Sequence, residues 1–227
     1  MLVHIAGLLT KDEVVQCRSI LEASPWVDGK TTAGEQAAAA KFNLQIPEGS
    51  PAAMQAGDII LRALGRTPAF TAAVLPLRVL PPMFNRYDAG MKFEAHVDGA
   101  VRAIPGANMR MRADVSSTLF LTDPEDYDGG ELMVDDTYGS HKVKLPAGDI
   151  IIYPATSLHH VIPITRGSRW SSFFWTQSMV RDDGQRTQLY ELDMAIMDVR
   201  QKLTDSDRST VALTSHYHNL LRRWAEL

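Results

Sequence analysis

The chain has 227 residues, of which 45% are hydrophobic and 22% are charged, and its formal net charge is −4 at pH 7. This composition excludes an intrinsically disordered chain, and the length suits one well-buried domain with helical additions or two small domains. The basic residues form no run or stripe, so we do not expect electrostatic binding to nucleic acid.

The sequence also bears on the cellular compartment. No stretch reaches the roughly 20 apolar residues that a membrane span needs. Residues 1–9 are apolar but lack the basic flank and the small-residue cleavage site of a signal peptide. The single cysteine, Cys17, rules out an internal disulfide and suits a reducing compartment. We therefore expect a cytoplasmic protein without a membrane partner; the sequence does not indicate its oligomeric state.

Residues 1–76 are predicted to form a mainly helical N-terminal support region. Thr10-Lys11-Asp12-Glu13 has the pattern of a capping box, in which the first and fourth side chains close the start of a helix. Ser50-Pro51 predicts a second helix start, and Gly65 can end that helix. Between the two helices, residues 28–34 are expected to form a loop.

Residues 77–180 change character and are predicted to form a β-rich core. Short β-rich runs alternate with turn signals such as Asp128-Gly129-Gly130, with no helical pattern between them. This spacing indicates an antiparallel sandwich or barrel rather than a doubly wound α/β fold. The predicted strands cover Val115–Leu121, Glu131–Val134, Lys142–Leu145, Ile150–Tyr153, Val161–Thr165 and Trp170–Gln177.

Residues 181–227 return to a helical pattern and are predicted to form a small C-terminal domain. Two apolar stripes recur at helical spacing, and we interpret both as surfaces packed in a core. The first stripe consists of Leu189, Leu192, Ile196, Val199 and Leu203, and the second of Leu213, Tyr217, Leu220, Leu221 and Trp224.

Three residues of the central region have the types found in a metal site. In an extended backbone, His96 and Asp98 point to the same side, so both can reach one ion. His159 follows 61 residues after Asp98, across the predicted β-strands. Two histidines and one carboxylate form the facial triad of non-haem iron(II) oxygenases, although these residue types alone do not exclude zinc. The neighbouring His160 would face the opposite side of its strand.

Arg169 lies ten residues beyond His159, at the start of the next predicted strand. The planar guanidinium can hold a carboxylate through two parallel hydrogen bonds, as required at the far end of a dicarboxylate that chelates a metal. For both residues to face one site across a hairpin, a three-residue loop at 165–167 would have to pair Arg169 with Pro163. That loop predicts a positive φ at Gly167, or else a bulge near Pro163.

An ordered string of short motifs resembles the prolyl-4-hydroxylase-type 2-oxoglutarate oxygenases, and among them the bacterial PKHD-type hydroxylases. The resemblance covers nearly the whole chain. The motifs are Tyr87-Asp88-Ala89-Gly90, His96-Val97-Asp98, Gly129-Gly130-Glu131-Leu132, Ala147-Gly148-Asp149, Tyr153-Pro154, Ser157-Leu158-His159, Val161 to Arg169 and Phe173-Phe174-Trp175.

The resemblance implies a double-stranded β-helix (jelly-roll) core with N-terminal helices and a helical C-terminal domain, an α+β arrangement. It implies Fe(II) held by His96, Asp98 and His159, and 2-oxoglutarate as co-substrate held by Arg169. O₂ would be the second co-substrate, ascorbate would re-reduce iron that oxidises without turnover, and hydroxylation would release succinate and CO₂. Tyr87 either reaches the iron-chelating end of the co-substrate or is a buried core residue. No catalytic residue separate from the metal site is expected.

The substrate is the least determined part of this hypothesis. Residues 100–112 are expected to form a mobile loop beside the open face of the site, and their arginines hint at an anionic or polar substrate. The resemblance suggests a siderophore-like small molecule linked to iron uptake, with a peptide residue as the alternative. Two other functions stay open: a cupin-like metal enzyme that does not use 2-oxoglutarate, and a non-catalytic iron-binding or iron-sensing module.

Overall fold

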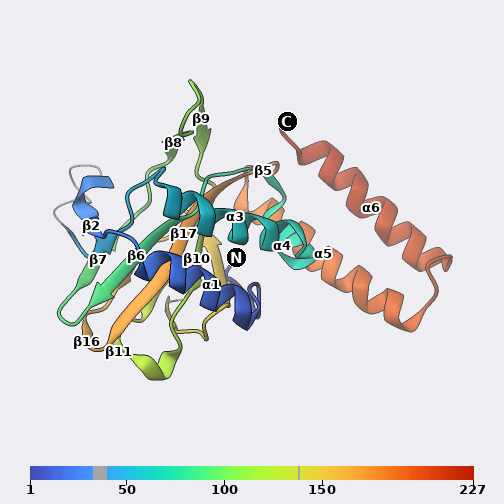
Figure 1. Ribbon diagram of the computed structural model, residues 1–227. Coiled ribbons are helices and arrows are strands. Elements are labelled where there is room, and N and C mark those ends of the chain that lie inside the picture. Colours follow the sequence, from blue (N-terminus) through green and yellow to red (C-terminus); the bar gives the residue numbers. More distant parts are fainter. Residues whose placement is uncertain (33–39, 138) are drawn as a thin grey trace.

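The computed structural model describes residues 1–32, 40–137 and 139–227 (Figure 1). Two antiparallel β-sheets form the body of the molecule, and helices cover one sheet and extend from one end. The helices are α1 (Lys11–Glu22), α3 (Pro51–Gly65), α4 (Pro68–Val74), α5 (Asp183–Lys202) and α6 (Arg208–Trp224), with the short 3-10 helices η1 (Gly29–Thr32) and η2 (Pro124–Asp126). The strands are β1 (Val3–Ile5), β2 (Val27–Asp28), β3 (Lys41–Phe42), β4 (Leu44–Gln45), β5 (Pro76–Val79), β6 (Met83–Asp88), β7 (Lys92–His96), β8 (Val101–Ala103), β9 (Arg110–Arg112), β10 (Val115–Phe120), β11 (Asp128–Gly129), β12 (Leu132–Asp136), β13 (Gly139–Val143), β14 (Ile150–Pro154), β15 (His159–Val161), β16 (Ile164–Arg166) and β17 (Ser168–Ser178).

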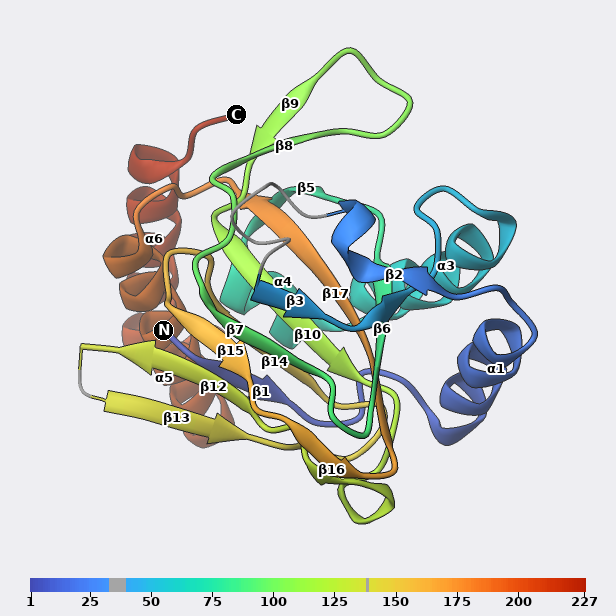
Figure 2. The ribbon, with the colours of Figure 1, turned by 90° about the vertical axis from the view of Figure 1, so that its left-hand side faces the viewer.

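The two sheets have different sizes and lie face to face (Figure 2). The larger has the order β1-β14-β10-β17-β6-β4-β2, with β5 on β17, and the smaller has the order β13-β12-β15-β7-β3. One apolar cluster joins Phe120 and Ile151 of the larger sheet to Leu132 and Val161 of the smaller one. Two antiparallel sheets closed over a shared core form the double-stranded β-helix, so the jelly-roll prediction is confirmed.

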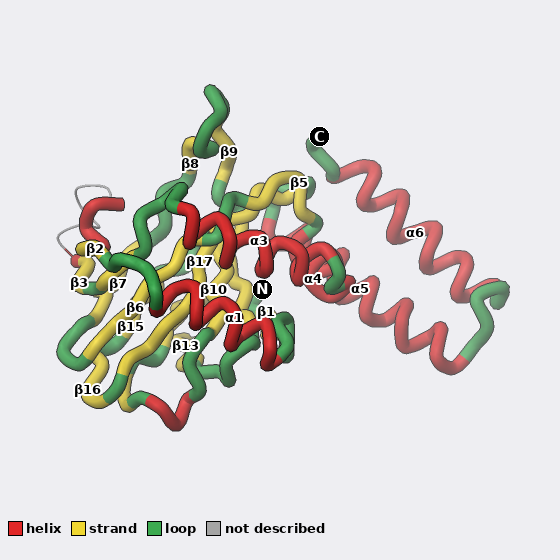
Figure 3. Tube along the Cα trace, in the orientation of Figure 1, coloured by secondary structure: helices red, strands yellow, loops and turns green. Residues whose placement is uncertain are grey.

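The outer face of the larger sheet is apolar, and helices cover it (Figure 3). Along β14, Ile150 and Ile152 face a cluster that also contains Cys17 and Leu21 of α1 and several residues of α3. The intervening Ile151 faces the smaller sheet. Successive strand residues alternate between the two faces of a sheet. A strand that is buried on both faces therefore has a continuous apolar sequence.

Residues 1–32 and 40–76, the described part of this region, contain the predicted helix starts together with the four short strands β1 to β4. Thr10 caps α1 in a complete capping box with Glu13, as predicted. Ser50 caps α3 with Pro51 in the first turn, and Gly65 is the last helical residue. The expected loop at 28–34 contains η1, and residues 33 and 34 lie outside the described residues. The strands β1 to β4 extend both sheets, so this region takes part in the β core as well as covering it.

The C-terminal helices α5 and α6 form an antiparallel hairpin that projects from the jelly roll (Figure 1). Its base packs on Leu75 and Val180 through Leu189 of α5 and Tyr217 and Trp224 of α6. Toward the projecting end of the hairpin, the first apolar stripe is open to solvent, since Leu203 is 44% exposed. Core packing therefore explains only part of this stripe. None of the helices in the described residues is long and apolar enough to cross a membrane.

Two expectations about the loops need correction. Residues 100–112 are not an irregular loop, because β8 and β9 pair into a hairpin that projects from the body. Gly167 has a φ of 71°, as predicted, but the strands around it form no hairpin. β16 pairs with β11, whereas Ser168 and Arg169 of β17 pair with Asp88 and Tyr87 of β6. The chain crosses between sheets at Gly167, where an added Cβ would lie 2.1 Å from the carbonyl oxygen of Asp126.

Candidate metal centre

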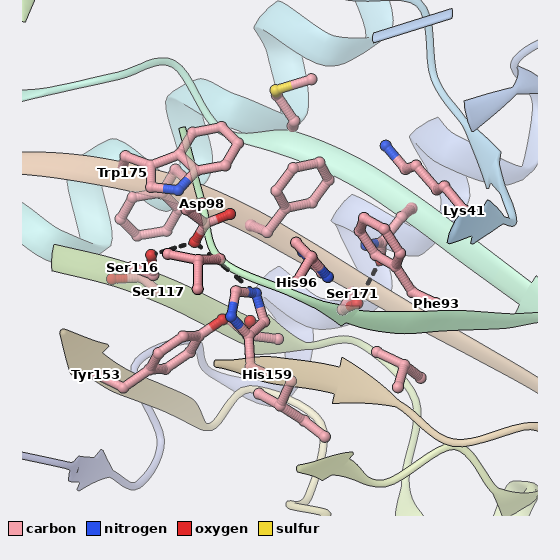
Figure 4. A pocket seen from close by; sticks show the side chains of 18 of the residues that line it. Lys41, Phe93, His96, Asp98, Ser116, Ser117, Tyr153, His159, Ser171 and Trp175 are labelled. Carbon is pink, nitrogen blue, oxygen red and sulfur yellow. Dashed lines mark hydrogen bonds and ion pairs between the residues drawn. The ribbon is translucent and has the colours of Figure 1, made fainter. Parts of the chain in front are cut away.

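His96, Asp98 and His159 lie together at one end of the space between the sheets (Figure 4). One candidate ligand atom from each residue lies within 4.8 Å of the other two. Strand pairing creates this proximity, because His159 of β15 is the register partner of His96 at the end of β7. Asp98 follows just beyond the strand end, so the convergence of the pair does not come from a continuous strand. The arrangement offers two nitrogens and one oxygen to a single ion.

Hydrogen bonds orient the three side chains toward one point. Nδ1 of His96 is 2.8 Å from the carbonyl oxygen of Glu94, and Nδ1 of His159 is 3.0 Å from that of Ser157. Each contact leaves the Nε2 atom for a metal, which is the usual arrangement of metal-binding histidines. Ser116 Oγ donates to one oxygen of Asp98 at 2.5 Å, and Nε2 of His159 lies 3.8 Å from that same oxygen.

The electrostatic state of the histidines also suits a metal. Burial, and next the positive charge that His159 would carry, lower the pKa of His96 to about 4. The imidazole of His96 is therefore neutral near pH 7 and has a lone pair to donate. His159 is buried, and its ring lies 4.3 Å from the His96 ring between centroids. With the Asp98 carboxylate beside them, the two packed imidazoles can share one bound cation.

Arg169 is buried on the other sheet, at the inner end of the same cavity. Only 1% of it is exposed, and its guanidinium lies 5.1 Å from the centroid of the Phe120 ring. Nη1 donates to Ser171 Oγ at 2.7 Å, and Ser171 in turn donates to Asn85 at 2.5 Å. Within the described residues, Nε of Arg169 has no hydrogen-bond partner and no carboxylate lies within ion-pair distance. A buried cation in this state is costly, so the geometry fits a bound anion.

Tyr87 is a buried core residue beside Arg169, and its contact with the iron-chelating end of the co-substrate stays a prediction. It is fully buried within the core cluster between the sheets, and it also lines the cavity. As the register partner of Arg169, it lies with its ring centroid 5.5 Å from the guanidinium. Asn85 Nδ2 donates to the Tyr87 hydroxyl at 3.4 Å. Burial raises the pKa of Tyr87, and the charge of Arg169 opposes that rise.

The cavity that joins these groups has a volume of about 760 Å³, within the range of pockets that bind small molecules. Val97 and Leu158 line its open side and are 52% and 42% exposed. The cavity therefore has a candidate set of metal ligands on the side of the smaller sheet, a buried cation on the larger sheet and an open side toward solvent.

Sequence reasoning missed several polar residues of this cavity. Ser171 and Asn85 share strand parity with Arg169 and Tyr87, so the alternation rule could have found both. Ser116 is the first of three consecutive hydroxyl residues in β10, which is a weaker signal. Lys41 and Arg102 also line the cavity. Arg102 lies in the segment 100–112, whose arginines had hinted at an anionic substrate, whereas no local pattern marks Lys41. Glu94, which shares parity with His96, is exposed and lies outside the triad.

Comparisons with known proteins agree with this geometry. Residues 82–177 match the 2OG-Fe(II) oxygenase superfamily, and residues 183–226 match the PKHD-type hydroxylase C-terminal domain. The chain is 68% identical over 227 residues to a PKHD-type hydroxylase of Methylobacterium nodulans, with 100% of both chains covered.

Solved structures share the fold at lower identity. A prolyl-4-hydroxylase from Pseudomonas putida is 21% identical, with a TM-score of 0.51 over 78% of this chain and 92% of that chain. HygX from Streptomyces hygroscopicus, solved with nickel and 2-oxoglutarate bound, is 17% identical, with a TM-score of 0.53 over 79% of this chain and 84% of the other.

The fold and the superfamily match define an Fe(II)- and 2-oxoglutarate-dependent oxygenase, a class of enzyme that uses O₂. Within that class, the chain belongs to the PKHD-type hydroxylase family. The predicted family and enzyme class are therefore confirmed. This membership disfavours both a cupin-like enzyme that makes no use of 2-oxoglutarate and a non-catalytic iron-binding module.

Proposed function

We propose that this hydroxylase binds Fe(II) through His96, Asp98 and His159 and binds the far carboxylate of 2-oxoglutarate through Arg169. One observation carries the assignment: a converging set of three ligand atoms and a buried guanidinium without a carboxylate partner lie at opposite walls of one cavity. A dicarboxylate that chelates the ion at one end places its other carboxylate at such a guanidinium.

Bound iron would supply the activation of O₂, coupled to decarboxylation of 2-oxoglutarate. The overall reaction inserts one oxygen atom of O₂ into a C–H bond of the substrate and the other into the carboxylate of succinate, with release of CO₂. The chain positions the groups and excludes water. Tyr87 packs beside the guanidinium, and the Ser171–Asn85 pair fixes the direction of Arg169.

The proposal includes the setting in which the enzyme works. Its substrate is a small molecule rather than a peptide, supported by the size of the cavity and its position between closed sheets. A siderophore-like compound linked to iron uptake is the substrate type that the family resemblance suggests. Ascorbate serves as the reductant for iron oxidised without turnover, and the protein works in the cytoplasm without a nucleic-acid partner.

Succinate formation from 2-oxoglutarate, with metal binding measured by calorimetry, tests the assignment of the ligands. We expect His159→Ala to abolish turnover and Fe(II) binding, because it removes one of three ligands. The matched control is His160→Ala, since His160 lies on the same strand as His159, pairs with Met133 of β12 and lies outside the triad. Loss of turnover in the control together with an active His159→Ala variant would refute the assignment. Metabolite profiles of cells with and without the protein would then identify compounds that differ by one oxygen atom.

A further inference from the structure

Two cations line the cavity away from Arg169. Lys41 extends from β3 into the cavity (Figure 4), and Arg102 reaches it from β8. Only 5% of Lys41 is exposed, and its ammonium lies 5.5 Å and 5.8 Å from the centroids of the Phe93 and Phe173 rings. Lysine is rarely buried to this extent, because taking an ammonium out of water is costly.

Arg102 is held differently. Its guanidinium lies 4.0 Å from the centroid of the Trp175 ring, so the aromatic face fixes the position of the charge. Among the residues that the structure describes, no carboxylate lies within 4.0 Å of this guanidinium. The other arginines of residues 100–112 do not line the cavity: Arg112 is paired with Asp114 and Glu226, and Arg110 is exposed.

Charged groups of both signs act on Lys41. Burial first, and then the charge of Arg102, lower the pKa of Lys41 to about 8, so the ammonium is still largely protonated at pH 7. Asp28 and Asp98 oppose this effect, but in the proposed function Asp98 is a ligand of the iron. Two neighbouring cations in a largely closed cavity are stabilised when an anion lies between them.

We infer that Lys41 and Arg102 bind a carboxylate of the small-molecule substrate, whose apolar part packs on Phe93, Phe173 and Trp175. The inference rests on the proposed function, since it assigns the remaining space of the same cavity. This anion site is separate from that of the co-substrate. Arg169 lies on β17 beside Tyr87, whereas Lys41 and Arg102 come from an edge strand and a projecting hairpin.

Fluorine NMR can test this recognition with a matched pair of probes, 4-(trifluoromethyl)cinnamate and its primary carboxamide. Each probe is titrated into anaerobic protein loaded with Fe(II) and saturating 2-oxoglutarate, which fills the site at Arg169. The proteins are the wild type, Lys41→Met, Arg102→Met, the double variant, and the exposed control Arg110→Met. Methionine keeps an apolar stem at each position, and melting temperatures verify folding. The 2-oxoglutarate affinity is measured separately for every variant.

We expect the wild type and Arg110→Met to bind the carboxylate at least tenfold more tightly than the amide. Each single variant should reduce this preference at least threefold, the double variant should abolish it, and Arg102→Lys should retain part of it. The affinity for 2-oxoglutarate should stay within twofold of wild type in all of them.

Equal wild-type affinity for the two probes, or a preference that survives in the double variant, would overturn the inference. Loss of 2-oxoglutarate binding in Lys41→Met would assign that cation to the co-substrate instead. Tighter binding of a blocked Asp-Glu dipeptide than of the cinnamate would replace the small-molecule substrate by a peptide. The proposed function fails on a different measurement, the absence of 2-oxoglutarate binding to wild-type protein.

Discussion

The inner and outer ends of the cavity differ in how their cations are held. At the inner end, Arg169 is 1% exposed and belongs to an eleven-residue strand in the middle of the larger sheet. Its direction is set by a hydrogen-bonded chain through Ser171 to Asn85. At the outer end, Arg102 is half-buried on a three-residue strand of a projecting hairpin and rests on one aromatic ring.

This difference suits a fold in which the co-substrate is the same in every family member while the substrate differs among them. A group fixed by neighbouring strands recognises a single geometry, because its side chain cannot move without disturbing the core. A hairpin outside the sheets can change in sequence and length at little cost to stability. We therefore expect changes to the polar side chains at the inner end of the cavity to have the larger effects.

The largest effect is expected at Arg169. Arg169→Lys keeps the charge but loses the two parallel hydrogen bonds, so 2-oxoglutarate affinity should fall by about tenfold to hundredfold, equivalent to roughly 1.5–3 kcal/mol. Arg169→Glu should weaken it further by placing two negative groups together. Calorimetric titration of 2-oxoglutarate and Fe(II) measures both effects. Fe(II) affinity without 2-oxoglutarate should change little, and an unchanged 2-oxoglutarate affinity in Arg169→Glu would remove the role assigned to this residue.

A smaller loss is expected at Ser116, whose hydroxyl holds one oxygen of Asp98. Partners that orient metal ligands typically contribute tenfold to hundredfold in metal affinity. Ser116→Ala should therefore weaken Fe(II) binding by about tenfold, as measured by competition with a chelator of known affinity. The control is Ser117→Ala, which alters the next residue of β10 without removing a hydrogen bond to Asp98. Equal losses in the two variants would show that Ser116 acts only through packing.

Lys41 should affect stability in a direction that depends on pH. Its pKa falls from about 10.5 in the unfolded chain to about 8 in the folded protein. Between these values the unfolded chain binds more protons, so wild-type stability should rise as pH increases from 8 to 10.5. Below pH 8 the buried ammonium is destabilising, and Lys41→Met should raise the free energy of unfolding by about 1–3 kcal/mol at pH 7.

Urea denaturation of wild type and Lys41→Met at pH 7 and pH 10 measures this effect. The advantage of the variant should shrink at the higher pH, since the wild-type lysine becomes neutral. A variant that is less stable at pH 7 would show that Lys41 is stabilised by its surroundings rather than retained for binding.

The smallest effect concerns the helical layer that supports the inner end. Cys17 of α1 is fully buried, and burial raises the pKa of its thiol to about 12. Only the thiolate reacts readily with disulfide reagents. Native protein should therefore not react with Ellman's reagent within an hour, while protein in guanidinium chloride should release one equivalent of thiol. Fast reaction of the native protein would mean that the layer behind the larger sheet opens more easily than its packing indicates.

The strands from residue 115 onward were predicted from the sequence better than β6, the earlier strand that lines the cavity. All six predicted β runs overlap strands, because their apolar residues and turn signals are local. β6 was not predicted as a strand, although it contains Asn85 and Tyr87. Its outer face meets helices and its inner face lines a polar cavity, so neither alternation nor a continuous apolar run marks it. Only the tertiary structure explains its pattern.

At the candidate site, too, features set by neighbouring residues were predicted, whereas the pairing of distant strands was not. The motif string located His96, Asp98, His159 and Arg169, which the structure places around one cavity. The backbone at Gly167 was predicted correctly, but the pairing around it was wrong. A positive φ records only a local reversal of the chain, whereas the pairing partners β6 and β11 lie about 40 to 80 residues away in the sequence, beyond the reach of turn rules.

The crossing at Gly167 has a consequence for the choice among 2-oxo acids. It places His159 and Arg169 on opposing sheets, although only ten residues separate them in the chain. Stacked sheets lie about 10 Å apart, and packed side chains hold that separation constant. In the proposed function, the fixed distance between the metal ligands and Arg169 therefore selects a co-substrate of matching length. A 2-oxo acid one carbon shorter, such as oxaloacetate, could chelate the metal or reach the guanidinium but would span the gap poorly.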